Sequence, residues 1–170
     1  CISSAASDVY KRQLYNLSLL TLGFLFHHPI AVTIYIIITG SLCAVTGGYH
    51  CKTRISCYIL SYTVFSIYLL TIATIPMISA YILIPIYIIC WILILVVSPV
   101  DTPNKVFSKS AKKTARKKTY IIFFFNSIFT ILSLLLHWNK GLIFIDLSLI
   151  ICATGLYTGY ISNIRRHHES

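Results

Sequence analysis

The sequence predicts an all-α, polytopic integral membrane protein with about six transmembrane or membrane-embedded helices. Hydrophobic residues make up 57% of the chain, charged residues 11%, and the mean hydropathy is +0.82. No Lys, Arg, Asp or Glu occurs between Ile55 and Val100. A soluble core of this size would need more polar surface, so the apolar segments are expected to cross a bilayer as one membrane-embedded domain, residues 1–170.

The apolar segments can be placed one by one. A span needs roughly 20 apolar residues, and turn-forming residues separate the candidates. A shorter sixth segment, Leu14–Phe26, is expected either to cross the bilayer or to lie in its interface. The five better candidates are Ile30–Val45, Ile55–Ile75, Met77–Ser98, Tyr120–Trp138 and Leu142–Ser162.

The net charge of +10 has a membrane explanation. In a six-span arrangement every Lys and Arg except Lys140 falls on one side, which the positive-inside rule identifies as cytoplasmic. Both termini and the polar segment Gly47–Cys57 then face the cytoplasm of a multi-pass cell-membrane protein. This distribution indicates anionic lipid headgroups as a partner and argues against nucleic acid.

Residues 99–119 are expected to form a basic cytoplasmic loop. Its run Lys109–Lys118 either forms a basic helix on the headgroups or extends the next span into the cytosol. The same charges could determine topology or dock an acidic partner electrostatically. The cations assigned to this second role are Lys112, Lys113, Arg116, Lys117 and Lys118.

Other polar or reactive residues in the spans are expected to be structural. Cys90 and Cys152 lie inside apolar segments and are expected to pack as small hydrophobic residues without disulfides. Asp146 stands near Lys140 and the interface, which predicts a solvated carboxyl. Residue 1 is Cys and not Met, so the native start is expected upstream.

The segment GGYHCKTRISC, Gly47–Cys57, interrupts the apolar sequence with a histidine, two cations and two cysteines. A cysteine becomes nucleophilic when an imidazole and positive charge favour its thiolate. For Cys57, His50 supplies the imidazole, and Lys52 and Arg54 supply the charge. The alternative is an interfacial histidine and a buried cysteine.

Spacing constrains this dyad. In a continuous helix His50 and Cys57 would stand about 10.5 Å apart along the axis, beyond hydrogen-bond reach. Gly47 and Gly48 make a helix break favourable. We therefore expect His50 in a loop or re-entrant turn and Cys57 near the start of the next helix, where the helix dipole favours a thiolate.

Three neighbours have two interpretations each. Gly47 and Gly48 could donate backbone N–H groups to an oxyanion or serve only as turn residues. Ser61, one turn beyond Cys57, could hydrogen-bond within the site or to its own helix. A metal site built on His50, Cys51 and Cys57 lacks a fourth protein ligand, so neither a metal nor a cofactor is expected.

Two motifs resemble the AgrB family, the integral-membrane cysteine endopeptidases of Gram-positive quorum-sensing systems. The first is Gly47-Gly48-Tyr49-His50, followed after six residues by Cys57 and then by Ser61. The second is SPVDTPNK, Ser98–Lys105, which is similar to the family's Pro-x-Asp-x-x-Asn-Lys segment. At Cys43 the chain departs from the family, which often has an arginine there.

The resemblance implies a peptidase that removes the acidic C-terminal tail of a short precursor peptide and retains the upstream part as an acyl-enzyme. An internal thiol or hydroxyl of that peptide then closes a thiolactone or lactone ring. Carried over by position, Cys57 would be the nucleophile and His50 the general base. The acidic tail would meet Lys52, Arg54 and the Lys105–Lys118 cations.

Two other functions are compatible with the composition. A small transporter or exporter would have six spans and a polar re-entrant segment, but also paired polar residues near the bilayer midplane. A non-catalytic membrane scaffold would tolerate replacement of both His50 and Cys57. The apolar surface also leaves room for a homodimer.

Overall fold

The computed structural model describes residues 2–48, 53–75, 78–100 and 108–169, and every regular element in these ranges is an α-helix. The predicted all-α fold is therefore confirmed. The helices are α1 (Ile2–Leu25), α2 (Pro29–Thr46), α3 (Arg54–Thr74), α4 (Ala80–Val97), α5 (Lys109–Leu135) and α6 (Asn139–Glu169).

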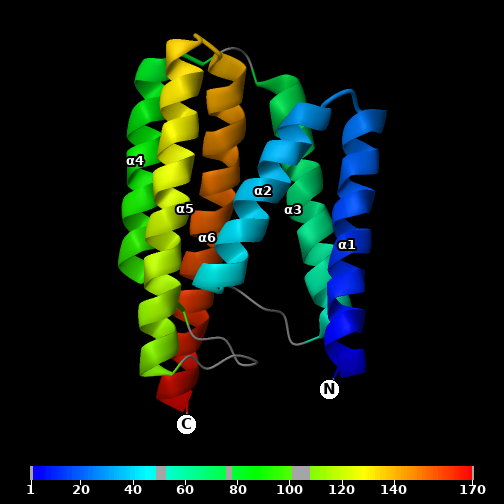
Figure 1. Ribbon diagram of the computed structural model, residues 1–170, viewed down its shortest axis with the longest axis vertical. Coiled ribbons are helices and arrows are strands. Elements are labelled where there is room, and N and C mark those ends of the chain that lie inside the picture. The colour runs from blue at the N-terminus through cyan, green and yellow to red at the C-terminus, as the bar shows by residue number, and fades with distance from the viewer. Residues whose placement is uncertain (1, 49–52, 76–77, 101–107, 170) are drawn as a thin grey trace.

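The helices run nearly parallel along the long axis, in two groups joined by α2 (Figure 1). Helices α4, α5 and α6 pack against one another on one side, and α1 and α3 stand on the other. Helix α2 crosses obliquely between the groups and contacts α1, α5 and α6. Both termini lie at the same end of the molecule.

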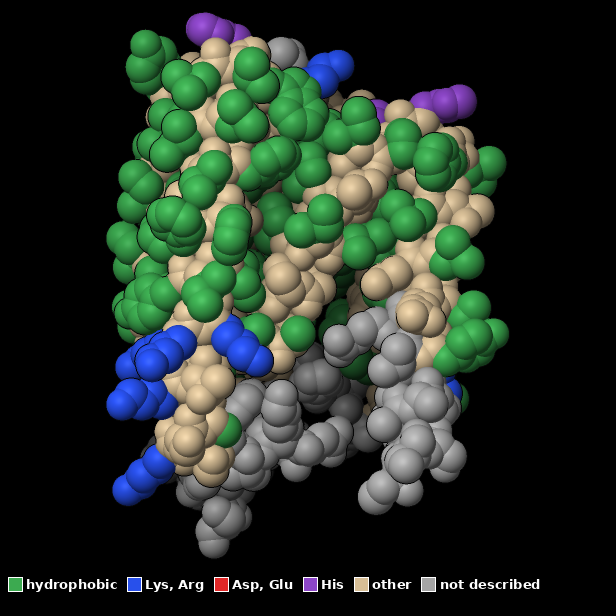
Figure 2. All heavy atoms as spheres, in the orientation of Figure 1, with side chains coloured by type: hydrophobic (Ala, Val, Ile, Leu, Met, Phe, Trp, Pro, Cys, Tyr) green, Lys and Arg blue, Asp and Glu red, His purple; other side chains and the backbone are tan. Residues whose placement is uncertain are grey.

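Five helices in the described part of the chain are long and apolar enough to cross a membrane: Pro29–Thr46, Ile55–Thr74, Ala80–Val97, Lys109–Leu135 and Asn139–Ile164. They correspond to the five predicted spans, which confirms a polytopic membrane protein. Figure 2 shows hydrophobic side chains covering the middle of the molecule. Most Lys and Arg side chains visible in that view gather at the end where the termini lie.

The basic run Lys109–Lys118 is helical in the structure. Helix α5 begins at Lys109, so residues 109–119 are helical and belong to the following span. The Ser108 hydroxyl accepts a hydrogen bond from the N–H of Ala111 at 3.2 Å and thereby caps the helix. Alanine and lysine are also strong helix formers. Of the two arrangements predicted for this run, the structure has the one in which it is continuous with the helix of the following span. The assignment of residues 99–119 to the cytoplasm stays a prediction.

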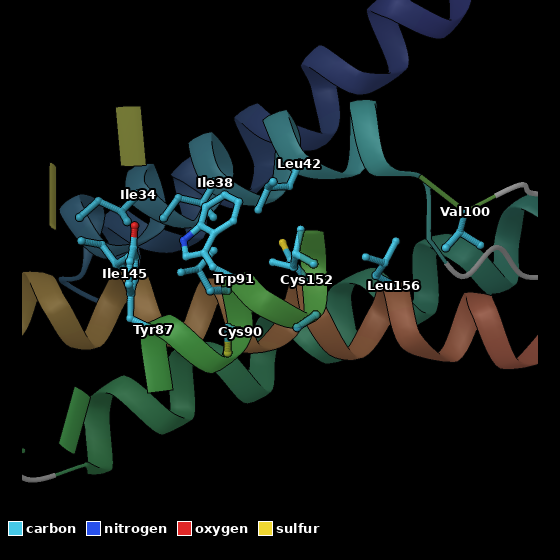
Figure 3. Packing of buried hydrophobic residues seen from close by; sticks show 13 residues of the cluster. Ile34, Ile38, Leu42, Tyr87, Cys90, Trp91, Val100, Ile145, Cys152 and Leu156 are labelled. Atoms are coloured by element: carbon cyan, nitrogen blue, oxygen red, sulfur yellow. The ribbon is translucent and has the colours of Figure 1, made fainter. Parts of the chain in front are cut away.

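The largest core cluster lies between α2, α4 and α6. Figure 3 shows Trp91 of α4 among side chains of the two other helices. Ile38 and Leu42 approach from α2, while Cys152 belongs to α6. Cys90 and Cys152 are both buried and carry free thiols, which confirms the prediction that they pack as small hydrophobic residues.

The prediction that the Asp146 carboxyl is solvated is wrong, because the residue is buried. Its side chain is 4% exposed, and its Oδ2 has no hydrogen-bond partner within the described ranges. Helix α6 starts at Asn139, so Asp146 lies about 10 Å along the helix from that end. A short side chain at this depth and on this face does not reach water.

Helix α3 is held by aromatic contacts. Phe65 and Tyr68 are buried with Tyr35 of α2, and the rings of Tyr35 and Tyr68 lie 4.7 Å apart between centroids. The Tyr68 hydroxyl donates to the carbonyl oxygen of Ala31 at 2.9 Å. Most other α3 side chains are exposed, so these contacts fix where the helix stands.

Candidate active site

The predicted helix break occurs at Gly47 and Gly48. Helix α2 ends at Thr46, and the two glycines have φ values of 76° and 149°. Residues with a side chain rarely adopt such values, so glycine allows the chain to leave the helix axis here. Gly48 also lies against α6, since a Cβ atom on it would stand 3.7 Å from the carbonyl oxygen of Gly155.

Cys57 lies at the start of α3, as predicted. Thr53 is the N-cap: its hydroxyl accepts a hydrogen bond from the N–H of Ser56 at 3.2 Å. The N–H of Cys57 donates to the Thr53 carbonyl at 3.2 Å, the first full turn of the helix. The Cys57 thiol is free and half-buried, so it is both held by the helix and reachable.

Tyr15 of α1 packs against the first turns of α3, a contact that the sequence did not reveal: the centroid of its ring lies 6.3 Å from that of Tyr58 and 5.3 Å from that of Tyr62. Ser61 and Cys57 are one turn apart on α3 and thus share a face. Cys57 and Ser61 therefore lie on the same side of α3, and their role in a site stays a prediction.

The start of the second motif, Ser98–Lys105, lies beside the start of the first motif, Gly47–Cys57. The N–H of Val100 donates a hydrogen bond to the carbonyl oxygen of Thr46 at 2.9 Å. Ser98 is buried, and its hydroxyl lies 3.4 Å from that of Thr119 on α5. The segment that follows α4 is thus fixed to the end of α2 and to α5.

Several predicted site residues lie outside the described residues. His50 and Lys52 are among them, as are Asp101, Asn104 and Lys105 of the second motif. Arg54 is the first residue of α3, but its side chain is also outside the description. The His50–Cys57 dyad therefore stays a prediction. Across the described ranges, no three His, Cys, Asp or Glu side chains come together as a metal site.

The cations of the basic run occupy the first turns of α5. Ala115 and Thr119 are buried and set which face of the helix packs against the bundle. The cations lie around the rest of its circumference: Lys113, Arg116, Lys117 and Lys118 are exposed, and Lys112 is half-buried. This part of α5 is at the same end of the molecule as the start of α3, where Cys57 lies.

The fold and this site define a polytopic, all-α membrane protein with a reachable cysteine in the first turn of a helix that follows a glycine break. The accessory gene regulator B (AgrB) family model matches residues 14–159, most of the chain, so the protein belongs to the AgrB family. Membership associates it with quorum-sensing peptide processing. No curated protein and no solved structure matches the chain.

Proposed function

We propose that the protein is a membrane-embedded cysteine endopeptidase. It cleaves the C-terminal tail from a short quorum-sensing precursor peptide through an acyl-enzyme on Cys57, and promotes cyclisation of the retained part. The observation that carries this proposal is the position of the Cys57 thiol. It is half-buried and free, one turn into α3, and follows the positive-φ glycines that end α2.

The proposed cleavage uses His50 as the base. His50 takes the proton of the Cys57 thiol, and the thiolate attacks the carbonyl carbon of the scissile peptide bond. As that bond breaks, the proton passes from His50 to the leaving amine, and the tail departs. The upstream part of the peptide stays on Cys57 as a thioester.

The proposed cyclisation regenerates the enzyme. An internal thiol or hydroxyl of the bound peptide attacks the thioester carbon and gives its proton to His50. The bond to Cys57 breaks, the ring closes, and the sulfur recovers its proton. Exchange between two thioesters is nearly balanced in free energy, so the acyl activation is retained provided that water is kept out.

The surroundings of Cys57 support the exclusion of water. Cys57 is half-buried, and Phe65 and Tyr68 are fully buried two to three turns further along α3, a candidate membrane span whose other side chains are mostly exposed. The thiol therefore lies at the boundary between the polar segment and the apolar bundle. A precursor peptide that lies on the membrane surface can reach such a position.

The charge distribution supports an orientation of the protein in the membrane and an acidic substrate. We assign the end that carries both termini and the basic run to the cytoplasm, following the positive-inside rule. The exposed cations of α5 are proposed to attract the acidic tail of the precursor. Gly47 and Gly48 are proposed either to donate to the oxyanion or to serve as turn residues only.

The proposal can be tested by co-expression with the cognate precursor. Cys57→Ala and His50→Ala should abolish release of the tail. Cys51→Ala should not, because Cys57 and not Cys51 is the proposed nucleophile. A precursor whose internal nucleophile is replaced by Ala should leave an acyl adduct on Cys57, detected by intact-mass spectrometry. Normal processing by Cys57→Ala would contradict the peptidase function and favour a scaffold or transporter function.

A further inference from the structure

A series of buried hydrogen bonds joins α5 to the end of α2. It begins at Thr119 of α5, which is 1% exposed and whose O–H donates to the carbonyl oxygen of Ala115 at 3.1 Å. Because this proton is already engaged, the oxygen of Thr119 is the acceptor in its second bond, at 3.4 Å, and the Ser98 hydroxyl is the donor. Ser98 is 2% exposed, so Thr119 is its partner in the protein interior and not at a wet surface.

Two residues after Ser98, the same segment holds the end of α2. The last carbonyl groups of a helix have no partner within that helix, and the N–H of Val100 donates to the carbonyl oxygen of Thr46 at 2.9 Å. Val100 is buried, and in Figure 3 it lies at the end of the core cluster, beyond Leu42 and Leu156. Thr46 is the last residue of α2, so this bond acts directly before the glycine break.

A clasp can be defined from the four residues in these bonds: Thr46, Ser98, Val100 and Thr119. It connects two regions that the proposed reaction uses. Thr119 follows directly after the cations at 112–118 in the same helix, and these are proposed to receive the acidic tail. On the other side, the chain runs from Gly47 and Gly48 to His50. The clasp therefore fixes the glycine break relative to the cations of α5.

We propose that Thr119 is a positioning residue for the cleavage, because its hydroxyl holds the glycine break in place through the clasp. This inference rests on the proposed function of Cys57 and His50. A peptide whose tail is bound on α5 reacts efficiently only if the catalytic segment stands at a set distance from the bound tail. Thr119 does not contact the peptide in this role but acts through Ser98 and Val100.

The substitution Thr119→Val removes the acceptor and keeps nearly the same shape. The Ser98 hydroxyl would then be buried without a partner, which costs more free energy than the bond itself contributes, since its lost hydration is not replaced. The segment is expected to shift until this hydroxyl finds another partner, and Val100 moves with it. The carbonyl oxygen of Thr46 is then released. Thr119→Ser keeps the acceptor and should preserve the clasp.

Hydrogen exchange of the full chain in nanodiscs measures the clasp directly. The N–H of Val100 is resolved by mass spectrometry with electron-transfer fragmentation. Thr119→Val should speed its exchange by at least about fivefold, the low end of the cost of leaving a buried hydroxyl unpaired, and Thr119→Ser should not. Thr130→Val is the matched control and should leave Val100 unchanged. Thr130 is also buried on α5 and donates to the carbonyl oxygen of Asn126 at 3.0 Å, but lies about 16 Å further along the helix.

The kinetics of tail release separate positioning from general stability. With the cognate precursor, Thr119→Val should lower kcat by about fivefold and leave KM within about twofold, because the cations that bind the tail are unchanged. A residue that only stabilises the bundle would lower the midpoint of thermal unfolding and leave kcat of the folded protein as it is. In a double-mutant cycle, the losses from Ser98→Ala and Thr119→Val should not add, since both remove the same bond.

The outcomes distinguish this inference from the proposed function. Either an unchanged exchange of Val100 or an unchanged kcat in Thr119→Val overturns the positioning role, and so does an equal loss of kcat in Thr130→Val. Additive losses in the double-mutant cycle would show that Ser98 and Thr119 do not act on each other, which also overturns it. Cys57→Ala is measured in parallel. If that variant still releases the tail, the peptidase proposal fails, whereas exchange of Val100 still reports on the clasp.

Discussion

The N–H of Val100 donates a 2.9 Å hydrogen bond to the carbonyl oxygen of Thr46. Thr46 directly precedes the glycine break, and Val100 directly precedes Asp101. The two motifs recognised in the sequence, Gly47–Cys57 and Ser98–Lys105, therefore begin side by side although a pair of helices separates them in the chain. Val100 is also buried in the main core cluster, which anchors this contact to the bundle.

Gly48→Ala should destabilise the protein and lower processing. An alanine at φ 149° is strained by about 1 to 3 kcal/mol, and relief of that strain would move the segment that carries His50. Thermal unfolding in detergent and release of the tail measure the two effects. Gly40→Ala is the control: it lies within α2 with no atom within 4 Å of the added Cβ, and should unfold no earlier than the native protein.

Thr53→Ala should loosen the first turn of α3, because the hydroxyl that caps the N–H of Ser56 is lost. Loss of such a cap costs about 1 kcal/mol. Hydrogen exchange followed by mass spectrometry should show faster exchange near Cys57 than in the native chain. Thr63→Ala removes only a hydroxyl bonded to Ile59 within the same helix, and an equal effect there would contradict the capping role.

Charge reversal at Lys113, Arg116 and Lys117 to Glu should slow tail release and reduce its dependence on salt. These side chains are exposed at the end where the termini lie, and attraction between solvated charges weakens as ionic strength rises. Lys140→Glu alters a cation at the start of α6, the opposite end, and should leave processing unchanged. Equal processing by both variants would exclude the basic run as the docking surface.

Asp146→Asn should raise the midpoint of thermal unfolding. The carboxyl is buried with an oxygen that has no hydrogen-bond partner in the described structure, and a neutral group of the same shape avoids the cost of burying a charge, about 1 kcal/mol or more. Ser148→Ala on the same helix is a control for side-chain truncation. A lower midpoint in Asp146→Asn would show that the carboxyl itself is needed.

Hydropathy and glycine positions were sufficient to predict much of this fold. The spans, the break at Gly47–Gly48 and the position of Cys57 near a helix start follow from segment length and from backbone preferences, which act locally along the chain. The start of α5 was harder to place. A run rich in lysine resembles a solvated loop by composition, although its helix propensity is high.

Contacts between helices were not predictable in the same way. Tyr15 meets Tyr58 and Tyr62 only because α1 and α3 pack together, and no periodicity within either helix encodes that contact. The position of Asp146 in the chain indicates its approximate depth in the membrane but not the rotation of α6, which buries the carboxyl. An i, i+4 row of tyrosines at 58 and 62 was the one available signal for the α1 contact.

Helix α5 sets a fixed distance between its cations and the surface of the membrane. Its 27 residues extend about 40 Å, whereas the hydrocarbon core is about 30 Å thick. The first turns therefore project beyond the lipid as part of the span itself, and each cation stands at a fixed height above the membrane. The height of these cations above the membrane would then limit which acidic tails can bind them while the peptide also reaches Cys57. Some peptides would carry their acidic residues too near to the scissile bond or too far from it. When those residues bind to α5, the scissile bond would not lie at Cys57.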